Sequence, residues 1–568
     1  MGECWRRKRV LLGLSILAVV AGAGFAKNPT QSKATVPFNV RLSKPDTLRH
    51  ALNRLTFGTR PGDVESIIRI GLKRWIDIQL HPENVPENRV LLQRLQPFES
   101  LRLSIREAYV RYPPRHLVVA AVRSRGEMAD ILSPQQIALR PQERQQLFAF
   151  APVPLRREMM ASVSPQKVIA MDLTECKVLR AVYSNRQLQE LMVDFWFNHF
   201  NVFLNKGAER YTVRTYERDA IRPHIFGKFH DLLLETAKSP AMLFYLDNWQ
   251  SVAPENANVA SRPKARAKRG LNENYGRELL ELHTLGVEGG YTQRDVVDVA
   301  RCFTGWTIAN PRNGGAFEYE DRVHDKGQKV VLGHLIPAGG GMSDGLTVID
   351  ILSRHPSTAR FISFKLAQRF VSDDPPSSLV AHMTKTFLKT KGDMREVVRA
   401  MIMSPEFFSQ GAYNAKIKSP FEMIVSALRA TNADVVSGYA LADEFKKLGE
   451  PLYRKSEPTG YGDANSEWVT SAGLLERMNF CLALAHNRVP GVRVDVSSWA
   501  KEAAEDPLRL SRSILQKTPD PQTSSAIEKM MSDEKIRAQL ASAAKLSQPQ
   551  IPSLIAGITL GSPEFQRR

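Results

Sequence analysis

Proline and glycine divide this chain of 568 residues into short segments in which apolar residues recur at helical spacing. Residues 46–56, 61–70 and 72–80 are three such segments, and Gly58, Gly71 and Pro82 interrupt or end them. Apolar residues at i, i+3 and i+4 predict amphipathic helices, and proline and glycine predict where helices stop. Most of the chain shows the same alternation, so the sequence predicts many short helices packed on one another.

A recurring Ser-Pro pair marks further helix starts. It occurs at Ser239-Pro240, Ser404-Pro405 and Ser562-Pro563, and the last two pairs continue with Glu-Phe. Serine can cap a helix, proline fits its first position, and an acidic side chain is favourable in its first turn. We therefore assign these residues no catalytic role and expect repeated helical hairpins.

Extended structure is expected in only one segment, residues 317–335. Phe317 and Tyr319 alternate with polar residues, a turn is expected at residues 324–327, and three apolar residues follow at 330–332. The expected fold class is therefore mainly α, a multi-helix globular body of helical hairpins with one small β-hairpin insertion.

The N-terminus has the pattern of a secretory signal peptide over residues 1–26. Four basic residues at positions 6–9 precede the apolar run Val10–Ala23, and Gly24-Phe25-Ala26 supplies small residues at the cleavage site. The alternative is a retained membrane anchor, but the apolar stretch is shorter than the roughly 20 residues that span a bilayer. We expect cleavage, export to the periplasm or the extracellular space, and a linker at residues 27–45.

The mature chain stays strongly basic. The formal net charge of the whole chain is +19, and cleavage removes four cations and one acid, which leaves +16. In an exported protein this charge favours an anionic envelope polymer or a membrane surface as partner, and nucleic acid is an unlikely one. Residues 254–270 lack apolar periodicity, and we expect them to form a mobile loop that either binds anions or is simply solvated. Five cations lie in this segment: Arg262, Lys264, Arg266, Lys268 and Arg269.

Cysteine content constrains how the mature fold is held together. Cleavage leaves Cys176, Cys302 and Cys481, none of them in a CxxC pair, so at most one disulfide can form. The mature chain is long enough to bury a large core, and the fold must depend on that core.

The predicted helix at residues 186–202 carries a histidine that could be structural or functional. On a helical wheel, His199 lies in the middle of an apolar face that includes Trp196, while Glu190, Asp194 and Asn201 lie on the other side. A lone histidine on an apolar face is more often a hydrogen-bonded core residue than a ligand or a base.

A second predicted helix, residues 272–285, has an unusual density of charge. Glu273, Arg277 and Glu281 are four residues apart, Glu278 lies on the neighbouring strip, and His283 borders the apolar arc. This face could be a solvated array of ion pairs. Buried in a cleft, its carboxylates would instead take different pKa values, the condition for acid and base catalysis.

Four sequence motifs carry a resemblance to a known family. They are DFWFNHFNVF from Asp194, SPAMLFYLDN from Ser239, NENYGRELLELHTLG from Asn272 and RFVSDDPP from Arg369. With these motifs the chain resembles the bacterial family called domain of unknown function (DUF) 1800, from about Asp46 to Asn487. We therefore expect a family domain at residues 46–490 and a C-terminal helical segment at residues 491–568. The resemblance implies no reaction.

Two hypotheses about function remain. The first is a helical envelope binding or scaffold protein. The alternative is an exported hydrolase with a His/carboxylate site in a helix-lined cleft, where a divalent metal could bind, formed by His199, Asp247, Glu278, Glu281 and His283. Convergence of these five side chains on one pocket would favour the hydrolase, and dispersion would favour the scaffold.

Motifs of several common cofactor and enzyme classes are missing. The glycines at 339–341 precede an expected helix, but Asp344 follows them and no Lys-Ser/Thr does, so there is no nucleotide-binding motif. The chain also contains no HExxH motif of the common zinc peptidases.

Overall fold

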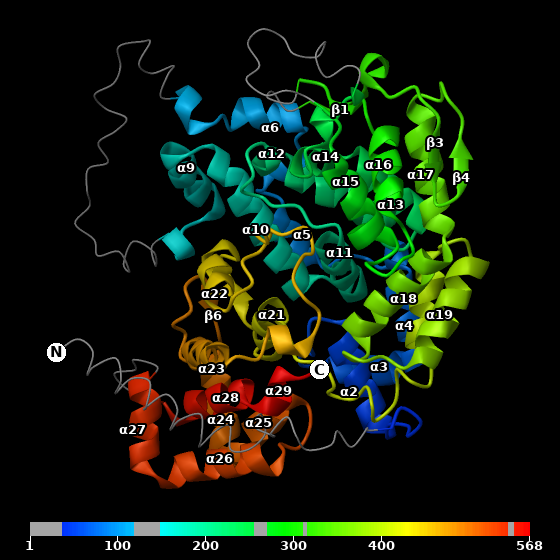
Figure 1. Cartoon of the computed structure of the whole chain (residues 1–568). Helices are drawn as coiled ribbons and strands as arrows, with labels where there is room; N and C mark the ends of the chain where they lie inside the picture. Colours follow the sequence, from blue (N-terminus) through cyan, green and yellow to red (C-terminus); the bar gives the residue numbers. More distant parts are fainter. Residues whose placement is uncertain (1–36, 119–147, 255–269, 311–314, 544–549) are drawn as a thin grey trace, which may run out of the picture.

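A computed structural model describes residues 37–118, 148–254, 270–310, 315–543 and 550–568 (Figure 1). Within these ranges the chain is mainly helical and has three two-stranded sheets, which confirms the predicted fold class. The expected signal peptide 1–26, most of the linker 27–45 and all five cations of the 254–270 segment lie outside the described residues.

The first three helices lie close to their predicted positions. They are α2 (Lys44–Leu55), α3 (Asp63–Ile70) and α4 (Leu72–Leu80). The Ser43 side chain caps α2 by accepting a hydrogen bond from the backbone N–H of Asp46. Gly71 separates α3 from α4 with a φ of 87°, a conformation that residues with a side chain rarely adopt.

The next helices form the upper part of the molecule in Figure 1. They are α5 (Arg89–Leu95), α6 (Ile105–Arg111), α9 (Val153–Val163), α10 (Gln166–Tyr183), α11 (Gln187–His199), α12 (Glu209–Thr215), α13 (Phe229–Lys238), α14 (Pro240–Tyr245), α15 (Glu273–Glu278) and α16 (Gln293–Cys302). Two π-helices interrupt this series: η3 (Tyr216–Ile221) continues α12, and η7 (Leu279–Thr284) continues α15. The predicted helix 272–285 is thus one element whose second half is wound more loosely.

The second half of the chain completes the body and adds a C-terminal group. The helices are α17 (Met342–Arg354), α18 (Pro356–Phe370), α19 (Ser377–Lys389), α20 (Met394–Ile402), α21 (Pro420–Ala430), α22 (Ala442–Lys447), α23 (Ser471–Ala485), α24 (Val496–Glu505), α25 (Pro507–Leu515), α26 (Pro521–Ser532), α27 (Glu534–Ala543), α28 (Ile551–Gly561) and α29 (Pro563–Gln566). Figure 1 shows α23 to α29 gathered at the bottom of the molecule.

The centre of the core is built from α10, α11 and α21. Every residue of α21 is buried, including Glu422 and Arg429. Helix α10 packs against α11 and α21, and Trp196 of α11 is completely buried. Since charged residues lie inside this core, they need partners there.

The strand pairing predicted for the hairpin at residues 317–335 is wrong. Strand β2 (Phe317–Tyr319) pairs with β1 (Trp306–Ile308), and β3 (Lys329–Val331) pairs with β4 (His334–Ile336). The first two residues of the expected turn are buried: His324 Nε2 lies 3.2 Å from Asp344, and Arg301 forms an ion pair with Asp325 at 2.8 Å. These contacts hold the segment against α16 and α17, so each strand finds a nearer partner. A third sheet joins β5 (Asp434–Val435) to β6 (Val492–Arg493).

Two of the three Ser-Pro pairs begin helices, as predicted. Ser239 caps α14 and Ser562 caps α29. The prediction is wrong for Ser404, because its side chain caps only a turn that follows α20, accepting from the N–H of Phe407. The chain cannot continue as a helix there, since Ser409 forms a β-bridge with Arg41.

The C-terminal segment packs closely on the rest of the chain. Helix α28 packs on α23, and Arg568 exchanges two backbone hydrogen bonds with Lys416. The three thiols Cys176, Cys302 and Cys481 are buried and free, so none of them forms a disulfide.

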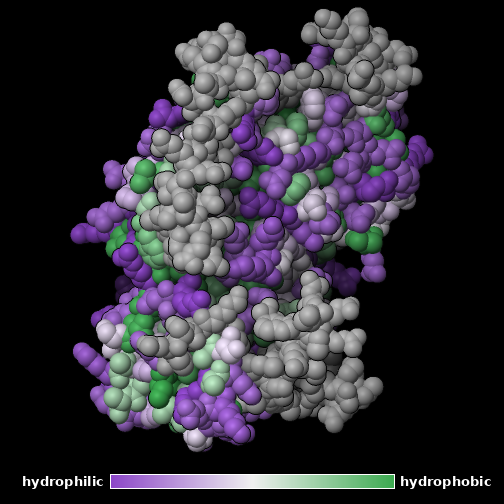
Figure 2. Space-filling model, turned by 90° about the vertical axis from the view of Figure 1, so that its left-hand side faces the viewer, coloured by the Kyte–Doolittle hydropathy of each residue, from purple (hydrophilic) through white to green (hydrophobic). Residues whose placement is uncertain are grey.

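The visible described surface is mostly hydrophilic, and hydrophobic residues appear in small separate patches (Figure 2). Among the described helices, none has the length and apolar character needed to cross a bilayer.

Candidate functional site

The two histidines predicted at the site contact each other in the core. His199 Nε2 lies 3.1 Å from the backbone carbonyl oxygen of His283, and the rings are 6.4 Å apart. Burial, only partly offset by this hydrogen bond, lowers the pKa of His199 to about 4. Burial, with a smaller contribution from the nearby His199, lowers the pKa of His283 to about 3. Both rings are therefore neutral at pH 7 and pack among aromatic rings such as Phe200.

The three predicted carboxylates have separate surroundings. Asp247, whose left-handed backbone ends the α14 turn, forms an ion pair with Lys206 at 2.9 Å. Glu281 accepts a hydrogen bond from the hydroxyl of Tyr291 at 3.2 Å. Burial and the neighbouring Glu281 raise the pKa of Glu278. Glu278 and Glu281 thus influence each other, but neither shares a hydrogen bond with the histidines.

The five predicted site residues do not share one cavity. His199 lines a space of about 50 Å³ that also contacts Lys365 and Asp463. Among the residues that the structure describes, no group of three or more His, Cys, Asp or Glu side chains is placed to hold a metal ion. The predicted residues therefore do not fit a divalent metal.

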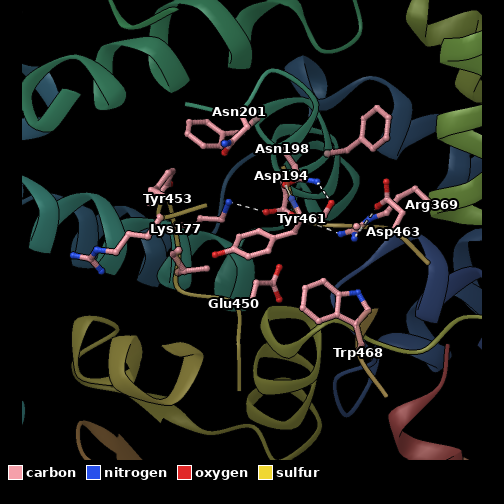
Figure 3. Close-up of a pocket in the computed structure, with 15 residues that line it drawn as sticks. Lys177, Asp194, Asn198, Asn201, Arg369, Glu450, Tyr453, Tyr461, Asp463 and Trp468 are labelled. Atoms are coloured by element: carbon pink, nitrogen blue, oxygen red, sulfur yellow. Dashed lines mark hydrogen bonds and ion pairs between the residues drawn. The ribbon is translucent and has the colours of Figure 1, made fainter. Parts of the chain in front are cut away.

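A neighbouring cavity gathers charged residues that the sequence did not place together. We call it the charged pocket (Figure 3), and it is lined by Lys177, Asp194, Phe195, Phe197, Asn198, Asn201, Arg369, Glu450, Leu452, Tyr453, Arg454, Tyr461, Gly462, Asp463 and Trp468. Its volume is about 30 Å³, room for one or two water molecules.

Asp194 of α11 joins two cations of the charged pocket. Lys177 of α10 lies 2.7 Å from one carboxylate oxygen, and Arg369 of α18 lies 3.1 Å from the other. Burial would lower the pKa of Lys177, but Asp194 and other nearby carboxylates raise it above its usual value. The ammonium of Lys177 also lies 4.9 Å from the centre of the Tyr453 ring. The cation is therefore stabilised by both a carboxylate and an aromatic face.

Asp463 extends this chain of charges toward the cavity of His199. Lys365 lies 3.0 Å from one of its oxygens, and Arg369 lies 3.6 Å from the other. Burial alone would raise the pKa of Asp463, but Lys365 and Arg369 hold it below its usual value. Asp463 lines both cavities, so the two spaces are separated by an ion-pair network.

Glu450 is the carboxyl of this pocket that can exchange a proton near neutral pH. Burial and the nearby Asp194 raise its pKa to about 7, against the effect of a hydrogen bond from the backbone N–H of Phe421. Figure 3 shows Glu450 and Lys177 near the ring of Tyr461. The Glu450 carboxyl could pass a proton to a water bound in the pocket.

A long segment between α22 and α23 forms one wall of both cavities. Residues 448–470, which we call the covering loop, contain one short 3-10 turn. Asn198 exchanges two hydrogen bonds with the backbone of Tyr461, at 2.7 and 2.8 Å. Asn201 donates to the carbonyls of Lys455 and Glu457. Loops of this length without regular structure are usually functional or disordered, and these side-chain contacts explain how this one stays ordered.

The polar side of α11, opposite its apolar face, also contacts the interior. Both sides are buried: Glu190 forms two hydrogen bonds with Arg222, and Asp194 and Asn201 reach the charged pocket. The available signal was the set of family motifs, because DFWFNHFNVF contains Asp194, Asn198 and Asn201, and RFVSDDPP contains Arg369. Their partners come from distant segments that the pattern cannot identify.

The fold and this site define the class of protein. It is a helical protein with a small pocket lined by ion-paired side chains, where α10, α11, α18 and the covering loop meet. The chain belongs to the family described as "Protein of unknown function (DUF1800)", whose model matches residues 50–567. This match confirms the resemblance and continues past Asn487 through the C-terminal segment. No curated protein and no solved structure matches the chain.

Proposed function

We propose that this protein is an exported helical envelope protein that binds an anionic partner, and that its buried histidines and carboxylates serve the structure. Two features of the sequence support the proposal. The first 26 residues have the order of a signal peptide, and the formal net charge of +19 favours anionic partners through long-range attraction.

One structural observation carries the choice of a binding protein over a hydrolase. Within the described part of the chain, the two histidines expected at a His/carboxylate site contact each other in the core, while Asp247 pairs with Lys206 and Glu281 bonds Tyr291 instead of either histidine. A hydrolase needs its base, its acid and the reacting atom within hydrogen-bond reach of one another. In the charged pocket, Asp194 and Asp463 are instead occupied by Lys177, Lys365 and Arg369.

A binding assay on the purified mature protein tests the proposal. Fluorescently labelled polygalacturonate serves as the acidic polymer, and dextran serves as the neutral control. We expect the protein to bind polygalacturonate and leave its chain length unchanged. His199→Asn should bind as the wild type does, because the His199 side chain is buried and cannot contact a polymer. Failure of the wild type to bind any anionic probe, polymer or vesicle, would overturn the proposal.

The second candidate is an exported hydrolase, and one observation favours it. The cavity of His199 adjoins the charged pocket, where burial and then Asp194 raise the pKa of Glu450 to about 7. An acid with that pKa suits proton transfer at neutral pH. Shortening of polygalacturonate by the wild type, but not by a folded Glu450→Gln variant, would establish this activity. An unchanged polymer in both samples would reject it for this substrate.

A further inference from the structure

An open groove lies beside α6, away from the charged pocket. We call it the α6 groove, and its walls come from α6, the π-helix η3, the junction of α13 and α14, and the ends of β1 and β2. Its volume is about 970 Å³, at the upper end of the range of roughly 300–1,000 Å³ for ligand sites.

We propose that the α6 groove binds an acidic polysaccharide. This inference rests on the proposed function and assigns a place and a chemical class to the anionic partner. It depends on three properties of the groove, namely its unpaired cations, its mixed apolar and polar walls, and its concave shape.

Two cations of the groove have no carboxylate partner. Arg106 of α6 is exposed and Lys238 lies in the last turn of α13, and neither forms an ion pair within the described part of the chain. A third cation, Arg218, is already neutralised by two hydrogen bonds to Asp219. Arg106 and Lys238 can therefore pair with carboxylates of a ligand without losing an existing partner.

The remaining lining suits sugar rings. Tyr109 and Phe317 are only partly buried, and Val110 of α6 is 72% exposed. Aromatic rings offer flat apolar faces on which the C–H faces of sugars can pack. The lining also includes Ser104, Thr215, Ser239 and Asn310, whose hydroxyl and amide groups can bond sugar hydroxyls.

A π-helix supplies part of the groove floor. Residues 218–220 of η3 line the groove, and that element runs from Tyr216 to Ile221. Such turns are rare and occur often at functional sites, so this observation supports a binding role independently of charge.

Shape and charge favour a polysaccharide over other anionic partners. A flat lipid surface could touch only the rims of a concave groove. Nucleic acid is an unlikely partner for an exported protein. The carboxylates of an acidic sugar chain can pair with Arg106 and Lys238 while its rings pack on Tyr109 and Phe317.

The test compares a groove variant with a matched control in the full mature protein. Arg106→Ala/Lys238→Ala removes the two unpaired cations of the groove. Lys385→Ala/Lys389→Ala removes two exposed cations of α19, one of them also in the last turn of its helix. The probes are fluorescent polygalacturonate, anionic phosphatidylglycerol vesicles and a single-stranded oligonucleotide, each titrated at the same salt concentration.

We expect the groove variant to bind polygalacturonate about tenfold more weakly than the wild type, the factor typical for loss of two partly exposed charge contacts. The control variant should stay within about twofold of the wild type. Wild-type binding that the groove variant retains in full would overturn the groove assignment and leave the proposed function standing. Binding of vesicles or oligonucleotide in preference to polygalacturonate would overturn the polysaccharide assignment. A wild type that binds none of the three probes would overturn the proposed function as well.

Discussion

Replacement of Asp194 by asparagine should destabilise the protein strongly. The substitution keeps the size of the side chain and removes the negative charge that Lys177 and Arg369 share. The side chains of Asp194, Lys177 and Arg369 are 15%, 12% and 10% exposed, so water can replace little of the lost interaction. The new amide also directs its NH₂ group at one of the two cations.

The expected cost is about 3–5 kcal/mol of unfolding free energy, the range for removing one partner of a buried ion pair. A matched control comes from Asp350, which pairs with Arg354 at 2.6 Å on an exposed helix face, where the side chains are 44% and 66% exposed. Asp350→Asn should cost less than about 0.5 kcal/mol, because exposed pairs four residues apart contribute little.

Urea unfolding of the wild type and both variants, followed by tryptophan fluorescence, measures the difference. The slope of the free energy against urea should be the same for all three proteins, so that the midpoints report stability. Equal midpoints for Asp194→Asn and Asp350→Asn would refute the view that the ion pairs of the charged pocket support the fold.

Three further predictions follow from the same contacts. Burial lowers the pKa of His199 to about 4 from about 6.5 in the unfolded chain, so the unfolded chain binds more protons between those pH values. As the pH falls from 7 to 4, the wild type should therefore lose up to about 3 kcal/mol of unfolding free energy relative to His199→Asn, measured by urea unfolding. Burial and the nearby Asp194 raise the pKa of Glu450 to about 7, so the folded chain binds more protons between pH 4.5 and 7. As the pH rises from 4 to 8, Glu450→Gln should therefore gain up to about 3 kcal/mol of unfolding free energy relative to the wild type. A stability difference that does not change with pH would contradict the pKa assigned to His199 or to Glu450. Asn198→Ala removes both bonds to Tyr461, and trypsin should then cut after Arg454 about tenfold faster; an unchanged rate would mean that other contacts order the covering loop.

Local chemistry made much of the fold predictable. Gly71 ends one helix and precedes the next, and the Ser239-Pro240 pair begins a helix, because these residues act through their own backbone and a near neighbour. The failure at Ser404 shows the limit of that reasoning. Its cap forms as expected, but a bridge between Arg41 and Ser409 redirects the chain.

Long-range contacts explain what the sequence could not predict about the site. His324 was expected in a turn, and Asp344, 20 residues further along the chain, holds it in the core. Asp194 was expected on the side of its helix opposite the apolar face, and its partners Lys177 and Arg369 belong to α10 and α18. His199 contacts the helix of His283 because both residues border apolar arcs that pack together.

The salt dependence of polymer binding tests the central claim most directly. If the basic mature protein recognises an anionic envelope polymer, its affinity for polygalacturonate should fall steadily as sodium chloride rises from 50 to 300 mM, because salt screens exposed charges. Dextran should not bind at any salt concentration. Affinity for polygalacturonate that is independent of salt, or equal binding of dextran, would contradict recognition by charge.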